Sequence, residues 1–98
     1  MVKHIILWKL KADLADLQAV KLGIKSGLEG LKGQIPGLLD ITVHTEGLPS
    51  SNMDVMLDST FADAASLKAY ATHPAHVAVA DGKVRPFTAQ RACLDFEV

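Results

Sequence analysis

The chain has 98 residues, 49% of them hydrophobic, and its formal charge at neutral pH is −1. This length predicts one domain, residues 1–98, with a single modest core, and the balanced charge gives no reason to expect nucleic acid or an anionic membrane as a partner. The one cysteine, Cys93, excludes an internal disulfide, and the opening apolar run is too short for a signal sequence or a membrane span, so we expect a cytoplasmic protein.

Residues 2–11 predict a strand that is apolar on both faces at its middle, as in a central strand covered on both sides. One face carries Val2, His4, Ile6, Trp8 and Leu10. A long amphipathic helix follows, with Asp13 as a candidate N-cap and an apolar stripe that runs to Ile35, and Pro36-Gly37 ends it. Gly23, Gly27 and Gly30 lie beside this stripe and indicate either close approach to a sheet or neighbouring element, or a loose helix.

Two strands, 38–46 and 53–61, are expected next, joined by a turn or loop over 47–52. A second helix begins at Asp63 and is interrupted by Pro74, and a further helical piece covers about 74–85. Residues 87–98 predict a last strand. One of its faces carries Leu94, Phe96 and Val98, and the other carries Arg91, Cys93, Asp95 and Glu97.

The order of these elements is βαββαβ, which predicts an α+β, ferredoxin-like fold: a four-stranded antiparallel sheet with both helices on one face. The right-handed crossover rule places the first and third strands in the centre. The far face of the sheet would then carry Ile5 and Leu7, with Arg91, Cys93 and Asp95 at its edge. A face that is apolar in the middle and charged around it favours a homodimer that packs two sheets together as a dimeric α+β barrel.

Three segments of the chain resemble one known family, the stress-responsive A/B barrel proteins. They are Lys3-His4-Ile5-Ile6-Leu7-Trp8-Lys9, the helical stretch with Tyr70 and His73-Pro74-Ala75-His76-Val77, and the closing Leu94-Asp95-Phe96. The resemblance covers nearly the whole chain and implies a ferredoxin-like protomer that dimerises through its sheet. Most members have no assigned activity. The family also includes olivetolic acid cyclase-like proteins, which close a polyketide by aldol condensation without a cofactor, and their catalytic tyrosine and histidine match Tyr70 and His76.

The chemistry of this pair agrees with that implied role. An imidazole that titrates near neutrality can remove a proton beside a carbonyl group, so His76 is a candidate general base. The Tyr70 hydroxyl is a candidate donor to the enolate or carbonyl oxygen. The alternative is a core tyrosine next to a histidine that hydrogen-bonds locally. His73 precedes proline and is expected at a turn.

A cavity between the sheet and the helices is the default ligand site for this layout. We expect it to be lined by the catalytic candidates Tyr70 and His76 and by the ligand-binding candidates His4, Ile6, Trp8, Leu57 and Val79. This lining suits a small apolar or aromatic molecule. His4 is either a core histidine with its polar atoms paired or a wall of the cavity, and Trp8 either fills the core or closes the cavity.

Nothing in the sequence indicates a cofactor or a metal ion. No glycine-rich phosphate loop follows the first strand, and His73-x-x-His76 is not a standard zinc spacing. Cys93 is expected to be a small residue of the dimer interface. Two functions remain open: a dimer without assigned activity that binds a small apolar molecule, and a cofactor-free enzyme, either a cyclase or a cofactor-independent monooxygenase.

Overall fold

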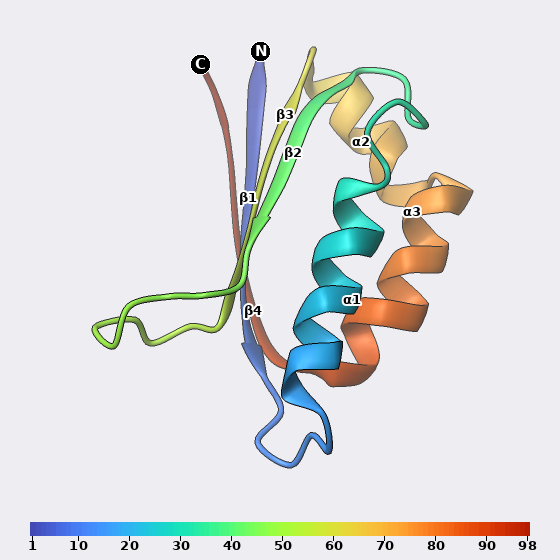
Figure 1. Cartoon of the computed structure of the whole chain (residues 1–98). Helices are drawn as coiled ribbons and strands as arrows, with labels where there is room; N and C mark the ends of the chain where they lie inside the picture. The colour runs from blue at the N-terminus through green and yellow to red at the C-terminus, as the bar shows by residue number, and fades with distance from the viewer.

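The computed structural model describes residues 1–98 and has the predicted ferredoxin-like fold (Figure 1). The elements are β1 (Val2–Leu10), α1 (Leu17–Glu29), β2 (Leu38–His44), β3 (Val55–Phe61), α2 (Ala64–Thr72), α3 (Pro74–Val79), the π-helical turn η1 (Ala80–Val84), the 3-10 turn η2 (Arg85–Phe87) and β4 (Thr88–Glu97). The antiparallel sheet has the order β2-β3-β1-β4, so β1 and β3 are central as predicted. All helices lie on one face of this sheet.

Helix α1 is shorter at both ends than the apolar stripe predicted. The Asp16 carboxylate, and not Asp13, caps it by accepting from the Ala19 N–H at 3.0 Å. After Glu29 the chain coils through turns in which Leu31 and Ile35 stay buried. Gly33 and Gly37 have φ values of 86° and 80°, which glycine adopts without strain, and such residues stop a helix from continuing.

The core lies between the sheet and the helices. The inner face of β1 contributes Val2, Ile6, Trp8 and Leu10 to one hydrophobic cluster, which also contains buried residues of α1 and of the turns that follow it. Helix α1 also approaches α3 closely, because a Cβ at Gly27 would stand 2.9 Å from Cγ1 of Val79. The predicted close approach is therefore confirmed at Gly27. At Gly23 the nearest atom outside the helix would be 3.7 Å away, an ordinary contact.

Strand β4 presents the opposite face to the one expected from its sequence. Its register with β1 pairs Ile5 with Leu94 and His4 with Asp95. Leu94 and Phe96 therefore join Ile5 and Leu7 on the outer face, whereas Arg91, Cys93 and Asp95 lie on the helix side. The expectation that these three residues belong to the outer face was wrong, because alternation tells which residues share a face but not which face meets the core.

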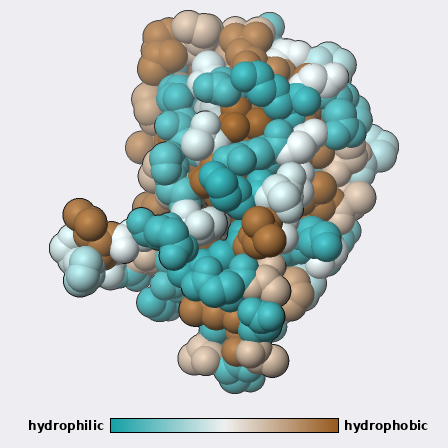
Figure 2. Space-filling model, in the orientation of Figure 1, coloured by the Kyte–Doolittle hydropathy of each residue, from teal (hydrophilic) through white to brown (hydrophobic).

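The outer face of the sheet is left uncovered by the chain's own helices (Figure 1). Leu94 and Phe96 are exposed there. Figure 2 shows hydrophobic side chains along the upper left margin, where Figure 1 places both chain ends, and at the tip of the loop between β2 and β3. That loop projects from the sheet on the side away from the helices. None of the helices combines the length and the apolar character that crossing a membrane requires.

Candidate ligand pocket

A pocket of about 620 Å³ opens between the helix side of β1 and β4 and the helices α2 and α3. Five of the seven residues predicted to line such a cavity do so: His4, Ile6, Trp8, Tyr70 and His76. The other two do not reach it. Leu57 lies on β3 and is fully buried in the core, and Val79 packs against Gly27 of α1. Both therefore belong to the scaffold of the pocket rather than to its lining.

The break between α2 and α3 brings Tyr70 and His76 together. In one continuous helix, residues six apart are rotated by roughly 240°, so their side chains would diverge. Here the helix ends at His73, whose backbone is extended (φ −64°, ψ 132°), and Pro74 starts α3. The His73 ring accepts the Ala75 N–H at 3.1 Å and so caps the new helix. After this kink the Tyr70 and His76 rings lie 4.1 Å apart between centroids.

Tyr70 is buried, with 2% of its surface exposed, yet its hydroxyl has no hydrogen-bond partner. Its ring packs at 4.9 Å from the Phe61 ring, measured between centroids. Burial raises the pKa of the phenol to about 12, so the hydroxyl keeps its hydrogen at neutral pH and remains a donor. A buried hydroxyl without a partner costs about 1–3 kcal/mol, and such groups in native proteins call for an explanation.

His76 is partly buried at the wall of the same pocket. Burial lowers the pKa of its imidazole below the usual 6.5, against a smaller opposing effect of the Ala71 carbonyl. The ring is therefore neutral at pH 7. Because a carbonyl only accepts, the contact of 3.3 Å between Nδ1 and the Ala71 oxygen places the ring hydrogen on Nδ1. Nε2 then carries the free lone pair that a general base requires.

His4 is a buried histidine with a partner, and it also lines the pocket. Its Nδ1 lies 2.5 Å from a carboxylate oxygen of Asp95 on the neighbouring strand. Its ring stands 6.1 Å from that of Tyr70, edge to face. Trp8 is 95% buried in the core and also lines the pocket, so the two alternatives considered for each of these residues are not exclusive.

Three pocket residues on β4, Arg91, Cys93 and Asp95, were not expected in the site. Because the sequence predicts these residues on the outer face of the sheet, it does not predict their proximity to His4. The signal that could have found them is the apolar set Leu94, Phe96 and Val98. The core of a dimer interface is enriched in apolar residues and depleted of charged ones. Applied to β4, this rule would place the apolar set on the outer face and Arg91, Cys93 and Asp95 on the helix side.

Comparison with known proteins agrees with this architecture. The family model described as "Stress responsive A/B Barrel Domain" matches residues 2–98. The chain belongs to this family. A dimeric protein of unknown function from Bacteroides fragilis is 33% identical, with a TM-score of 0.91 over 99% of this chain and 95% of the other.

Two more distant structures share the fold of this stress-responsive A/B barrel protein. A dimeric ferredoxin-like protein of unknown function from Thermobifida fusca is 22% identical, with a TM-score of 0.85 over 99% of this chain and 90% of the other. The hydroxynitrile lyase from Passiflora edulis is 19% identical, with a TM-score of 0.81 over 97% of this chain and 90% of the other. A comparison with curated proteins found no match.

Proposed function

We propose that this protein binds a small molecule with an apolar or aromatic body and at least one oxygen acceptor in the pocket beneath α2 and α3. The observation that carries the proposal concerns Tyr70, which lines this pocket and whose buried hydroxyl has no hydrogen-bond partner within the protein. A ligand oxygen that accepted from this hydroxyl would remove the cost of burying it unpaired. The protein would then gain affinity from a hydrogen bond that it does not form by itself.

The remaining walls define the ligand further. The pocket volume falls within the range of about 300–1,000 Å³ that is typical of small-molecule sites. Ile6, Trp8 and Leu67 supply flat or aliphatic surface for an aromatic ring. Three cationic side chains line the wall, Lys68, Arg85 and Arg91, against one carboxylate, Asp95. This excess of positive charge favours a ligand with an electron-rich or anionic oxygen, as in a phenol, an aryl ketone or an aromatic acid.

We also propose that the functional protein is a homodimer whose two chains pack through the outer faces of their sheets. Ile5, Leu7, Leu94 and Phe96 form an apolar patch on that face, and no element of the chain covers it. The relatives from Bacteroides fragilis and Thermobifida fusca are described as dimeric. Since the pocket opens on the helix side, a dimer of this kind leaves both pockets accessible.

The intrinsic fluorescence of Trp8 tests ligand binding directly, because it is the only tryptophan and lines the pocket. We expect members of a panel of phenols, aryl ketones and hydroxylated benzoates to change this fluorescence saturably. Tyr70→Phe keeps the ring and should weaken the best ligand by roughly 2- to 12-fold, the value of one hydrogen bond. A matched control, Ser26→Ala, removes an exposed hydroxyl from α1, away from both the pocket and the sheet, and should leave the affinity unchanged. Equal affinity of the wild-type and Tyr70→Phe proteins would contradict the proposal.

A second candidate function is cofactor-free catalysis at the same pocket. It is favoured by the neutral His76 ring, with its free Nε2, 4.1 Å from the ring of a protonated tyrosine. This pair suits removal of a proton beside a carbonyl group, as in an aldol-type cyclisation or as the first step of a cofactor-independent oxygenation. The related fold of a hydroxynitrile lyase supports the idea that this architecture can carry an enzyme.

His76→Gln separates catalysis from binding. If His76 is a base, this variant should bind the ligands found above with nearly unchanged affinity and lose turnover by about 10²–10⁴-fold, the usual contribution of a general base. Product formation is followed by chromatography with each member of the panel. Unchanged turnover in His76→Gln would exclude this residue as the base. That result would not contradict the proposed ligand binding.

A further inference from the structure

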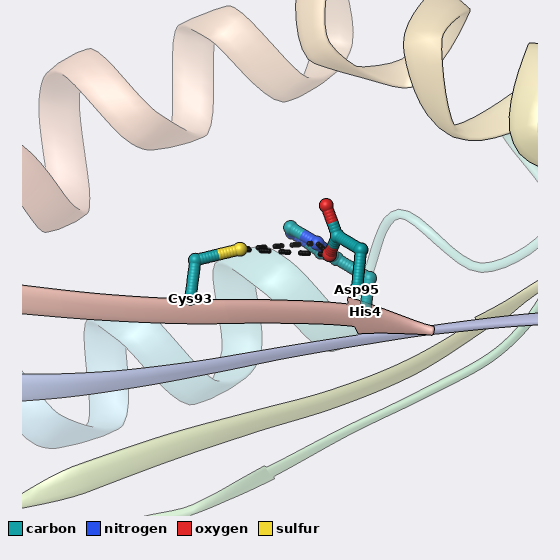
Figure 3. A group of neighbouring side chains, drawn as sticks. All are labelled: His4, Cys93 and Asp95. Carbon is teal, nitrogen blue, oxygen red and sulfur yellow. Dashed lines mark hydrogen bonds and ion pairs between the residues drawn. The ribbon is translucent and has the colours of Figure 1, made fainter. Parts of the chain in front are cut away.

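Three side chains with different metal-binding atoms converge on the helix side of the sheet, where they form part of the wall of the ligand pocket (Figure 3). They are His4 from β1 and Cys93 and Asp95 from β4. A carboxylate oxygen of Asp95 lies 2.5 Å from Nδ1 of His4 and 3.5 Å from Sγ of Cys93, and the distance from Sγ to Nδ1 is 3.8 Å. One imidazole, one thiol and one carboxyl group therefore point at a common volume.

The register of the sheet fixes this convergence. Asp95 is paired directly with His4, and Cys93 is paired with Ile6, two residues further along the same face of β1. Regular antiparallel strands carry all three residues, so no loop has to be ordered to assemble the group. His4 is buried, whereas Cys93 and Asp95 are exposed, so the cluster has a rigid base and an open side.

The geometry argues against a proton relay of the kind that activates a nucleophilic cysteine. In such a relay the nucleophile and the carboxylate contact opposite ring nitrogens of the histidine, so that the ring can pass a proton. Here Sγ and the Asp95 oxygen both approach Nδ1. In addition, partial burial and the neighbouring Asp95 carboxylate raise the pKa of the Cys93 thiol, so the sulfur is not a thiolate nucleophile by itself.

The same arrangement suits a metal ion, because a single ion needs lone pairs that converge. Zinc takes sulfur, imidazole nitrogen and carboxylate oxygen at about 2.3, 2.0–2.1 and 2.0–2.2 Å, which makes the edges of its tetrahedron roughly 3.3–3.6 Å long. The edges from Sγ to the oxygen and to Nδ1, at 3.5 and 3.8 Å, are close to these values. Only the hydrogen-bonded edge from Nδ1 to the oxygen, at 2.5 Å, must open.

We propose that His4, Cys93 and Asp95 bind one zinc ion, or a similar borderline divalent cation, per chain. On binding, the thiol releases its proton, and the ring hydrogen of His4 moves from Nδ1 to Nε2, so that three lone pairs face the ion. The thiolate and the carboxylate then balance its double charge, although Arg91 on the same face opposes binding through its own positive charge. Three protein ligands leave a fourth position on the open side, where water or an oxygen of a pocket ligand would bind.

Cobalt(II) in place of zinc tests this site, because ligation by a thiolate produces a charge-transfer band in the near ultraviolet. The purified full chain is kept reduced, stripped of metal with a chelator, and titrated without any organic ligand. We expect one cobalt ion per chain, a thiolate band, and displacement of cobalt by zinc. Zinc should also raise the melting temperature, since it binds only the folded cluster.

Two variants of exposed residues keep the test independent of folding. Cys93→Ser should abolish the thiolate band, and both Cys93→Ser and Asp95→Asn should weaken zinc binding by more than about tenfold, the lower limit seen even for outer-shell changes. The matched control is Glu97→Gln, an exposed carboxylate two residues further along the same strand. Absence of the band in the wild-type protein, half an ion per chain, or equal loss in Glu97→Gln would overturn the proposal. Fluorescence titrations of the metal-stripped protein test the ligand pocket separately.

Discussion

At the scale of single residues, the state of one hydroxyl matters most for the proposed function. Tyr70 and Ser59 are both buried hydroxyl residues, but only Ser59 has a partner, donating to the His4 carbonyl at 3.0 Å. The unpaired Tyr70 hydroxyl lowers the stability of the protein by itself, and a ligand oxygen that accepted its hydrogen would remove this cost. The Ser59 hydroxyl forms a structural hydrogen bond in either state. The two residues therefore form a matched pair for experiment.

Tyr70→Phe should leave the ligand-free protein as stable as the wild type, or more stable by about 1 kcal/mol, because it removes an unpaired buried hydroxyl. Ser59→Ala should lower the stability by about 1 kcal/mol, because a satisfied hydrogen bond is lost. Urea denaturation of the three proteins measures both changes. If Tyr70→Phe destabilised the protein as much as Ser59→Ala, the Tyr70 hydroxyl would have a partner, and the main support for the ligand proposal would be gone.

The pKa of His76 leads to a second prediction. Burial depresses this pKa in the folded protein below the ordinary 6.5, so the unfolded chain holds more protons between the two values. Stability should therefore rise as the pH rises through that window and fall as the pH drops through it. An NMR titration of the four histidines, with His76→Gln to identify the resonance, measures the midpoint. A midpoint at or above 6.5 would show that His76 is not desolvated at the pocket wall.

At the scale of elements, the contact between α1 and α3 fixes the position of α3, one of the two helices that cover the pocket. Gly27→Ala would bring a methyl group to 2.9 Å from Val79, so the gain in helix propensity should be offset by displacement of α3. Gly23→Ala meets only the end of the Lys83 side chain, at 3.7 Å, and should stabilise the protein by about 1 kcal/mol. Thermal unfolding of both variants gives the comparison. A gain at Gly27 equal to that at Gly23 would contradict the close approach.

The same elements show what the sequence allowed us to predict. The order of strands and helices, the break at Pro74 and the inner face of β1 follow from periodicity and from proline chemistry, and all were predicted. The face of β4 was not, because Leu94, Phe96 and Val98 look like core residues when the partner surface is unknown. The end of α1 was misplaced because Leu31 and Ile35 continue the apolar spacing although the backbone has left the helix. Side-chain clusters that depend on the register and the facing of strands, such as His4 with Cys93 and Asp95, could therefore not be predicted from the sequence.

At the scale of the whole molecule, the uncovered sheet face predicts the assembly. Leu94→Asp places a charge opposite Ile5 in the centre of the apolar patch and should convert a dimer into a monomer with half its mass, that of the 10.5 kDa chain. Leu22→Asp is the matched control, since Leu22 on α1 is 66% exposed and Leu94 is 65% exposed. Light scattering at micromolar concentration measures both masses. A wild-type monomer, or dissociation by Leu22→Asp alone, would contradict dimerisation through the sheet.

We propose that the molecule uses the outer face of its sheet for assembly and the pocket on the opposite side to bind a small molecule. A crystal structure with the tightest-binding member of the aromatic panel tests the claim most directly. We expect the ligand between β1, β4 and the helices α2 and α3, with one oxygen within hydrogen-bond distance of the Tyr70 hydroxyl. A ligand bound elsewhere, such as beside the loop between β2 and β3, with the Tyr70 hydroxyl still unpaired, would contradict it.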